Sequence, residues 1–358
     1  MDVAESVTAK DVARRADVSV GTVSRVFNNH MNVSEEIRQR VLKVAAEMGY
    51  FRVNGQVVGA RPTTGRMLKE VGFLYCSSIE ETPAIMDPYW TPIFHGIEGA
   101  ARKANIKITY RTITDICHIP HLLTTTLYEM RLGGILLVGQ ADAEVISTIQ
   151  ATHTPVVQVD NYAMDLGTPV DTILPDNCQG AAKAMDYLFS MGHKQIAFIG
   201  GPSAAGRGPL SIYSAQQRWM QYCMACLDRG LSVSYDLVEP GNFTMDGGYE
   251  ACKRLVERKV PFSAIFCVDD VTAIGALKAL REAGRKVPED VSIIGFDGID
   301  LGQHVTPSLT TIGVDTQALG EVALNTLIER AAHPDEPYIT KLIGIELVKR
   351  ESVAHYRV

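Results

Sequence analysis

Residues 8–50 of the chain read TAKDVARRADVSVGTVSRVFNNHMNVSEEIRQRVLKVAAEMGY. Thr8 stands three positions before a carboxylate, a spacing that resembles a capping box, and the apolar residues that follow keep a helical period. Residues 17–19 form a predicted turn, in which Val18 is the apolar plug and Ser19 caps the next helix. The stretch therefore predicts a short helix that ends in a tight turn before a second helix.

The second helix is predicted over about residues 20–27, and a third helix begins at residues 34–37. The apolar stripe of the third helix consists of Ile37, Val41, Val44 and Ala45. A helix, a tight turn and a second helix backed by a third form the layout that places one helix in the major groove of DNA. A capped three-helix stretch without a DNA role is the alternative, but the capping, the turn and the single arginine of the second helix all favour a helix-turn-helix.

The exposed face of the second helix is predicted to read DNA. Arg25 can form a bidentate contact with guanine, and the hydroxyls of Thr22 and Ser24 suit phosphate oxygens. Val20 and Gly21 donate no side-chain hydrogen bond, although valine can contact a thymine methyl group and glycine leaves room. Arg25 is therefore expected to carry much of the direct base recognition.

The run ADVSVGTVSRVFN, followed by NVSEEIRQRVLKVAAEMGY, resembles the DNA-binding domain of the lactose-repressor/galactose-repressor family. The resemblance continues over nearly the whole chain and implies a transcriptional regulator that binds double-stranded operator DNA. Together with the residues discussed above, it gives a predicted DNA-contacting set of Thr8, Ser19, Val20, Gly21, Thr22, Ser24, Arg25, Asn28, Asn32, Tyr50 and Ala60.

The linker after the head departs from the family pattern. Members of the family usually have a short hinge helix here, with a leucine that wedges into the central base step of the operator. Ala60 stands at the position of that leucine, and Gly55 and Gly59 each cost a helix about 1 kcal/mol relative to alanine. We therefore expect a weaker hinge within the linker of residues 51–69, and less bending of DNA than by the lactose repressor.

Charge is divided unevenly along the 358 residues. Residues 1–66 hold 10 Lys+Arg and 7 Asp+Glu, a net +3, whereas the remaining residues hold 24 and 34, a net −10. A basic head on an acidic body implies that only the head approaches DNA. No apolar run approaches the roughly 18 residues of a membrane span, and the N-terminus does not resemble a signal peptide, so a cytoplasmic protein is expected.

The seven cysteines are scattered, and only Cys223 and Cys226 form a C-x-x-C pair. A zinc or redox site would be the functional interpretation of this pair. Because the pair lies in a helical stretch and no second pair accompanies it, we interpret both cysteines as small helix-face residues. The sequence predicts no metal site and no cofactor.

Beyond the linker, strand-like and helix-like runs alternate in two successive series. Such alternation predicts parallel sheets with helices on both faces, here in two α/β lobes. Ligands of open parallel sheets bind outside the carboxyl ends of the strands, so the cleft between the lobes is the expected binding site. The predicted fold is a small all-α helix-turn-helix head plus an α/β body of two doubly wound parallel-sheet lobes.

The family resemblance implies a body similar to the periplasmic sugar-binding proteins, with interleaved lobes. The predicted divisions are a head at residues 1–50, a linker at 51–69, and a body at 70–358. Lobe one is expected at about residues 70–173 and 315–340, and lobe two at about 174–312 and 341–358. No leucine heptad follows the last strand, so a homodimer is expected rather than a tetramer.

Polar side chains at strand ends are the candidate ligand-binding groups of the body. Carboxylates accept hydrogen bonds from hydroxyls and a guanidinium donates to oxygens, a combination that suits a polyol. Aromatic faces can support the C–H face of a sugar. The predicted effector-binding set is Tyr89, Trp90, Asp160, Arg218, Phe243, Asp269 and Asp297. All but Asp160 match pocket positions that the resemblance implies, and the Asp-Pro-Tyr-Trp run is similar to repressors of galactoside use.

Each candidate also has a structural interpretation. A strand-end aspartate often caps the following helix. This alternative applies most strongly to Asp270, because a helix is expected to begin directly after it. Trp90 could be a core residue, and Arg218 could belong to a surface ion pair. The prediction of a ligand site therefore depends on the convergence of the set.

The sequence favours a repressor of carbohydrate-use genes that a small sugar releases from its operator. A regulator that needs a nucleobase or another small metabolite as corepressor is the alternative. An enzyme is disfavoured because the body has no P-loop, GxSxG, HExxH or convincing GxGxxG motif. A transport-type binding protein is disfavoured by the DNA-binding head.

Overall fold

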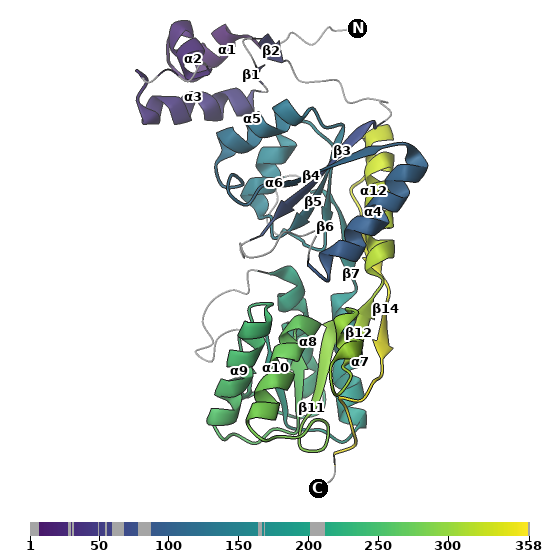
Figure 1. Ribbon diagram of the computed structural model, residues 1–358. Helices are drawn as coiled ribbons and strands as arrows, with labels where there is room; N and C mark the ends of the chain where they lie inside the picture. Colours follow the sequence, from purple (N-terminus) through teal and green to yellow (C-terminus); the bar gives the residue numbers. More distant parts are fainter. Residues whose placement is uncertain are drawn as a thin grey trace. The chain divides into compact units, whose positions relative to one another are not determined.

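The structure is a computed structural model that describes residues 7–27, 30, 32–48, 50–53, 56–58, 68–77, 87–163, 167, 169–200 and 212–356. The head, drawn in purple in Figure 1, contains helices α1 (Ala9–Arg15), α2 (Val20–Phe27) and α3 (Glu35–Glu47). Its core consists of Val12, Ala13, Ala16, Val23, Val26, Val41, Ala45 and Tyr50. These residues come from all three helices and from the segment after α3, so the head has a hydrophobic core of its own.

The turn between α1 and α2 forms as predicted. Asp17 adopts a left-handed backbone conformation with φ 53°, which reverses the chain directly after α1. The Val18 N–H donates to the Ala13 carbonyl at 3.0 Å, and the Val18 side chain packs against the head core. Val18 is therefore the predicted plug between the two helices.

The described part of the linker contains two paired strands and no helix. Strands β1 (Phe51–Val53) and β2 (Gln56–Val58) pair antiparallel, with Phe51 opposite Val58 and Val53 opposite Gln56. The two residues between the paired strands are Asn-Gly in the sequence, the combination that most favours a two-residue hairpin loop. The described residues of the linker thus form strands where the family usually has a hinge helix. Ala60 lies outside the described residues, so the weaker hinge stays a prediction.

Two compact units make up the chain. Unit 1 comprises Met1–Ala84, Gly96–Ile173 and Gly320–Thr340, and unit 2 comprises Ile85–His95, Leu174–Leu319 and Lys341–Val358. Among the described residues, no helix is long and apolar enough to cross a membrane.

The sheet of unit 1 has the strand order β13-β7-β6-β5-β3-β4. Its strands are β3 (Glu70–Cys76), β4 (Lys107–Thr112), β5 (Gly134–Gly139), β6 (Val156–Val159), β7 (Asp171–Pro175) and β13 (Thr340–Ile343). The pairs from β4 through β7 are parallel. Every residue of β5 is buried, as expected for a parallel strand that helices cover on both faces.

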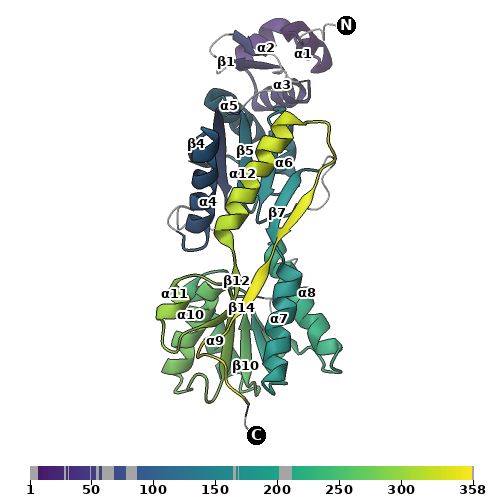
Figure 2. The ribbon, with the colours of Figure 1, turned by 90° about the vertical axis from the view of Figure 1, so that its right-hand side faces the viewer.

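Four helices accompany this sheet: α4 (Trp90–Ala104), α5 (Pro120–Met130), α6 (Ala143–Gln150) and α12 (Thr316–Ala332). Helices α5 and α6 contribute Leu123 and Val145 to one core with alternate residues of β3 and β5. Helix α12 crosses the sheet in Figure 2, and a Cβ at Gly134 of β5 would lie 3.1 Å from its Leu327. The sheet is therefore packed on both faces.

The sheet of unit 2 has the order β14-β12-β11-β10-β8-β9, parallel except that β12 and β14 are antiparallel. Its strands are β8 (Ile196–Ile199), β9 (Val238–Glu239), β10 (Ala264–Cys267), β11 (Ser292–Asp297), β12 (Thr310–Val314) and β14 (Ile345–Val348). Its helices are α7 (Asn177–Ser190), α8 (Tyr213–Leu227), the 3-10 turn η2 (Tyr235–Leu237), α9 (Met245–Glu257), α10 (Asp270–Glu282) and α11 (Leu301–His304).

Alternate residues of the strands in unit 2 face two separate cores. Phe198 and Phe266 pack with α7 and α8, whereas their neighbours Ala197 and Ile265 pack with α9 and α10. This period of two places a pair of helices on each face of the sheet. The predicted doubly wound architecture is confirmed for this unit.

Candidate functional site

The N-terminus of α2 is built by the predicted cap. The Thr22 N–H donates to Ser19 Oγ at 3.0 Å, and the two hydroxyl oxygens lie 2.9 Å apart. This confirms Ser19 as the cap of α2. Val20, the first residue of the helix, has 43% of its surface exposed despite being apolar. An exposed valine at a well-formed helix start is available for contact with a thymine methyl group.

Arg25 lies on the exposed face of α2. Its Nε donates to the Gly21 carbonyl at 3.2 Å, one turn earlier in the helix. A Cβ at Gly21 would lie 4.0 Å from Arg25 Nη2, so the absence of a side chain at Gly21 leaves the space beside the guanidinium open. Thr22 and Ser24 are half-buried next to these exposed residues. The structure thus brings the predicted base-reading and phosphate-binding residues of α2 to one face.

Thr8 lies at the start of α1, away from the base-reading residues in sequence. Its backbone N–H and its hydroxyl both donate to Asp11 Oδ2, at 2.9 and 2.6 Å, and these bonds lower the pKa of Asp11. Thr8 and Asn32 are exposed, which is compatible with contacts to DNA. Asn28 and Ala60 lie outside the described residues.

Tyr50 is a correction to the predicted DNA-contacting set. Only 2% of its surface is exposed, and its ring meets the Phe27 ring edge-on at 5.5 Å. Its N–H donates to the Ala45 carbonyl at 2.9 Å, which ends α3. The apolar ring therefore completes the head core, and Tyr50 is not on the surface that faces DNA.

Arg218 is a buried residue of α8, so the interpretation as a surface ion pair is wrong. Its Nη2 donates to Asp297 Oδ1 at 3.0 Å, and its Nη1 donates to the Val268 carbonyl at 2.6 Å. Nε donates to Asn177 Oδ1 at 2.9 Å, and Cζ lies 3.6 Å above the Phe296 ring. These contacts to four other chain positions fix the plane of the guanidinium.

Asp297 ends β11 in a conformation that is unusual for a residue with a side chain. Its φ is 97°, and Gly298 follows with φ 77°. Burial raises the pKa of Asp297 to about 7; the Arg218 guanidinium opposes this rise, and the charges of Asp269 and Asp87 add to it. A carboxyl that titrates near neutrality and bonds to a fixed arginine is a candidate ligand-binding group.

The helix-capping role considered for Asp270 belongs to its neighbour Asp269. Asp269 is the N-cap of α10 and accepts from the Thr272 N–H at 2.7 Å. Asp270 instead accepts from the N–H groups of Gly298 and Ile299, at 2.8 and 2.9 Å. The helix-cap interpretation of Asp270 is therefore wrong, and Asp270 holds the turn after Asp297 in place. Burial raises the pKa of both carboxyls.

The aromatic pair begins α4. Asp87 Oδ1 accepts from the N–H groups of Tyr89 and Trp90, at 2.8 and 3.2 Å, and the two rings meet edge-on at 5.0 Å. Burial raises the pKa of Asp87, and the charge of Asp87 in turn raises the pKa values of Asp269 and Asp297. The start of α4 therefore belongs electrostatically to the same site. Trp90 is half-buried and is not a core residue.

Phe243 and Asp160 complete the predicted set. Phe243 has φ 56° and packs against one hydrophobic core of unit 2. That core contains Phe296, the ring that lies beneath Arg218. Asp160 follows β6 in unit 1, has φ 56°, and donates its N–H to the Ile173 carbonyl at 2.8 Å. The structure thus links Arg218, Asp297 and Asp269 of unit 2 by a hydrogen bond and by charge, while Asp160 belongs to unit 1.

Sequence reasoning missed the residues that hold Arg218 in place. Asn177 is 3% exposed, and besides accepting from Arg218 it donates to the Pro175 carbonyl at 3.3 Å. Phe296 is fully buried beneath the guanidinium. The one available signal was an amide two residues after a buried strand, which also matches an ordinary helix start.

Burial suppresses the ionisation of both thiols of the C-x-x-C pair. Both cysteines lie in α8, and burial raises the pKa of Cys223 to about 12 and raises that of Cys226. Thiols with raised pKa values are poor nucleophiles and poor metal ligands. Within the part of the chain that the structure describes, no group of His, Cys, Asp and Glu side chains is placed to hold a metal ion.

Comparison with known proteins supports both the helix-turn-helix head and the α/β body. Residues 8–52 match the family model of bacterial regulatory proteins, lacI family, and residues 185–353 match a periplasmic binding protein-like domain. The HTH-type transcriptional repressor CytR of Escherichia coli (strain K12) is 34% identical over 354 residues, which cover 97% of this chain and 96% of CytR. The chain belongs to the lacI family of bacterial regulatory proteins.

Two further regulators are similar to nearly the whole chain. The ribose operon repressor of Haemophilus influenzae is 30% identical over 351 residues, covering 97% of this chain and 98% of the relative. The solved complex of the transcriptional regulator CelR with cellobiose has a TM-score of 0.72 at 25% identity, covering 97% and 99% of the two chains. As a lacI-family protein, the chain is a DNA-binding transcriptional regulator and not an enzyme.

Proposed function

We propose that the chain is a cytoplasmic repressor whose binding to operator DNA is controlled by a small molecule at the site around Arg218. A homodimer would place α2 of each head in the major groove of a pseudo-palindromic operator. The residues proposed to contact DNA are Thr8, Ser19, Val20, Gly21, Thr22, Ser24, Arg25 and Asn32. The ligand would change the population of DNA-competent dimers.

The proposed effector is a sugar or a sugar derivative. The observation that carries this proposal is the fixed Arg218, paired with Asp297, whose pKa is also raised by the charges of Asp269 and Asp87. Carboxylate oxygens accept from ligand hydroxyls, and the edge-on pair of Tyr89 and Trp90 offers an aromatic surface. The relatives support the same class, since a cellobiose complex and a ribose operon repressor are among them.

A nucleobase corepressor is the second candidate. Because the pKa of Asp297 lies at about 7, part of the population is protonated near neutrality and can donate as well as accept a hydrogen bond. A carboxyl of this kind can pair with the ring nitrogen and amino groups of a base. The repressor PurR of Mannheimia succiniciproducens, 30% identical over 349 residues, is among the relatives.

Selection of an operator from a random duplex pool, followed by binding in the presence of sugars and of nucleobases, tests the proposal. A sugar that releases the selected duplex would support the sugar-responsive repressor. A duplex that is bound only when a nucleobase is present would overturn the sugar proposal in favour of corepression.

A further inference from the structure

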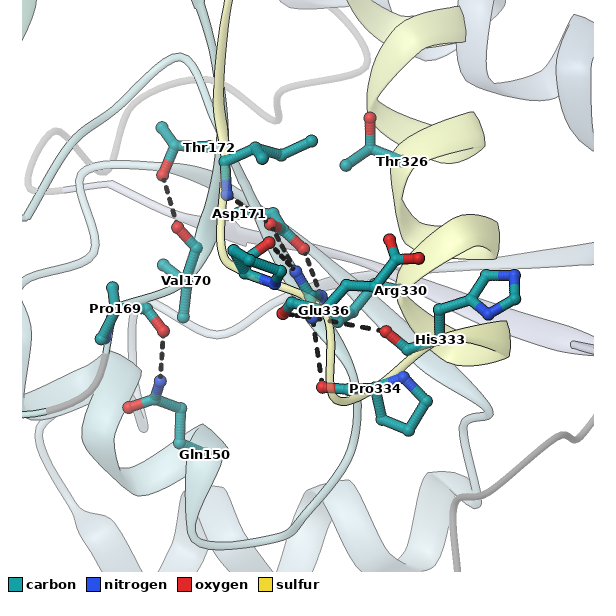
Figure 3. Close-up of polar contacts among 12 residues, drawn as sticks. Gln150, Pro169, Val170, Asp171, Thr172, Thr326, Arg330, His333, Pro334 and Glu336 are labelled. Atoms are coloured by element: carbon teal, nitrogen blue, oxygen red, sulfur yellow. Dashed lines mark hydrogen bonds and ion pairs between the residues drawn. The ribbon is translucent and has the colours of Figure 1, made fainter.

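A buried ion pair in unit 1 lies apart from both the DNA-contacting face and the proposed effector site. Arg330 stands near the end of α12, and Asp171 is the first residue of β7 (Figure 3). Nε and Nη2 of Arg330 donate to Oδ2 and Oδ1 of Asp171, at 2.6 and 3.0 Å. The two residues are 8% and 1% exposed, so the pair is bidentate and shielded from water.

The remaining donors of Arg330 organise the segment after α12. Nη1 donates to the carbonyls of Glu336 and Pro334, at 2.6 and 3.1 Å, and Nη2 donates to the Pro337 carbonyl at 2.9 Å. The Tyr338 ring lies 4.5 Å from the guanidinium carbon. As Figure 3 shows, the segment wraps around the guanidinium, which therefore holds backbone that is neither helix nor strand.

Asp171 extends the same network to β13. Its Oδ1 also accepts from the Ile339 N–H at 2.9 Å, and the Thr172 N–H donates to the Ile339 carbonyl at 2.9 Å. Ile339 directly precedes β13. One carboxylate therefore fixes the start of β7 and the start of β13 to the end of α12.

The chain passes from one unit to the other within each of the three elements that meet at this pair, β7, α12 and β13. The passages lie at Ile173–Leu174 in β7, Leu319–Gly320 in α12 and Thr340–Lys341 in β13. Helix α4 contains another passage, at His95–Gly96, and its Lys103 pairs with Glu321 of α12 at 3.0 Å. The exposed lysine pair is weak, whereas the buried arginine pair cannot be broken without leaving a buried charge uncompensated.

We propose that Arg330 is a positioning residue that makes β7, α12 and β13 one mechanically coupled element. The pair transmits a displacement of any one of these segments to the other two, because all three are bonded to the same two side chains. Lysine cannot take this role, since a point charge with three donors cannot reach both carboxylate oxygens and the three carbonyls together. The proposal holds whichever effector the protein binds.

Amide hydrogen exchange of the full-length Arg330→Lys variant tests the coupling. We expect exchange to rise by about tenfold or more, and by the same factor, in peptides covering residues 171–175 and 333–343. Peptides of β3 and β5, and those of α10 in unit 2, should be unchanged. Arg229→Lys is the matched control, because Arg229 forms an exposed ion pair with Asp186 at 2.6 Å in unit 2.

Faster exchange confined to residues 333–339 would overturn the proposal, since Arg330 would then only order its own loop. A uniform rise across unit 1 would also overturn it, because the pair would then contribute only general stability. If the variant does not fold, amide hydrogen exchange of the unmodified protein, measured at a series of low urea concentrations, tests the coupling instead. Residues 171–175 and 333–343 should open with one shared dependence on urea, and separate dependences would contradict the coupling.

Discussion

Nη2 of Arg218 lies 3.0 Å from Oδ1 of Asp297, and both side chains are buried. The bond joins α8 to the end of β11, and Asn177 and Phe296 fix the guanidinium from two further directions. The site holds several carboxyls near one arginine, so it is suited to a ligand that donates hydrogen bonds. The arrangement is prepared before a ligand arrives, which lowers the cost of ordering it on binding.

Arg218→Lys should weaken effector binding by roughly 2–5 kcal/mol, because the remaining carboxylate loses a partner in a desolvated site. Operator affinity in the absence of effector should be unchanged. Calorimetric titration with the sugar found by operator release measures the first quantity, and fluorescence anisotropy the second. Arg229→Lys, at an exposed pair, is the control, and equal effector binding by both variants would remove Arg218 from the site.

Binding of a neutral polyol should strengthen as the pH rises through the pKa of Asp297. This pKa is raised to about 7 by burial, so the folded protein retains a proton that the unfolded chain loses near the ordinary value of 3.8. Ligand hydroxyls donate to the ionised form, whose population rises from about one tenth at about pH 6 to about nine tenths at about pH 8.

The expected gain in affinity over this range is about tenfold. Titration calorimetry in buffers of different ionisation enthalpy measures the affinity and the proton released, and Asp297→Asn should give a flat profile. An affinity that falls as the pH rises would show that the protonated carboxyl is the binding form, as the nucleobase alternative requires.

Tyr50→Phe should leave operator affinity within about threefold of the unmodified protein, since a residue that is 2% exposed has little access to DNA. Tyr50→Ala should instead destabilise the head by about 3–5 kcal/mol, the usual cost of removing a buried aromatic ring. Anisotropy and thermal melting of the full chain separate the two effects. A folded Tyr50→Phe variant that no longer binds operator would restore Tyr50 to the DNA-contacting set.

Arg25→Ala should reduce discrimination at one base pair in each half-site by roughly 1–3 kcal/mol, because its guanidinium is the proposed bidentate donor to guanine on the exposed face of α2. Competition among operators with single base changes measures this loss. Arg15→Ala removes the same charge from the exposed end of α1, outside the proposed DNA-contacting set, and should change the affinity for all duplexes by the same factor. If Arg25→Ala also weakens all duplexes equally, Arg25 contacts only phosphate.

Local patterns in the sequence were sufficient for the head and for the alternation of strands and helices. The cap at Ser19, the plug at Val18 and the doubly wound sheets follow from spacing, period and turn chemistry that operate over a few residues. The pairing of β1 and β2 also has a local signal, the Asn-Gly pair between them, which a comparison of the linker with the family's hinge helix alone does not use.

The parts that sequence reasoning missed depend on contacts between distant segments. Asp269 and Asp270 are neighbours with identical side chains, and only the position of the turn after β11 decides which one caps α10. Asn177 lies 41 positions from Arg218, and no periodicity links them. Tyr50 could be assigned to the core only once the positions of α2 and α3 were known.

The most direct test of a ligand-controlled repressor is fluorescence anisotropy of the full chain with a palindrome selected from a random pool, titrated with sugars and nucleobases. We predict tight binding that falls steeply with salt and is abolished by one sugar. Failure to select any duplex sequence, with or without these ligands, would contradict the account.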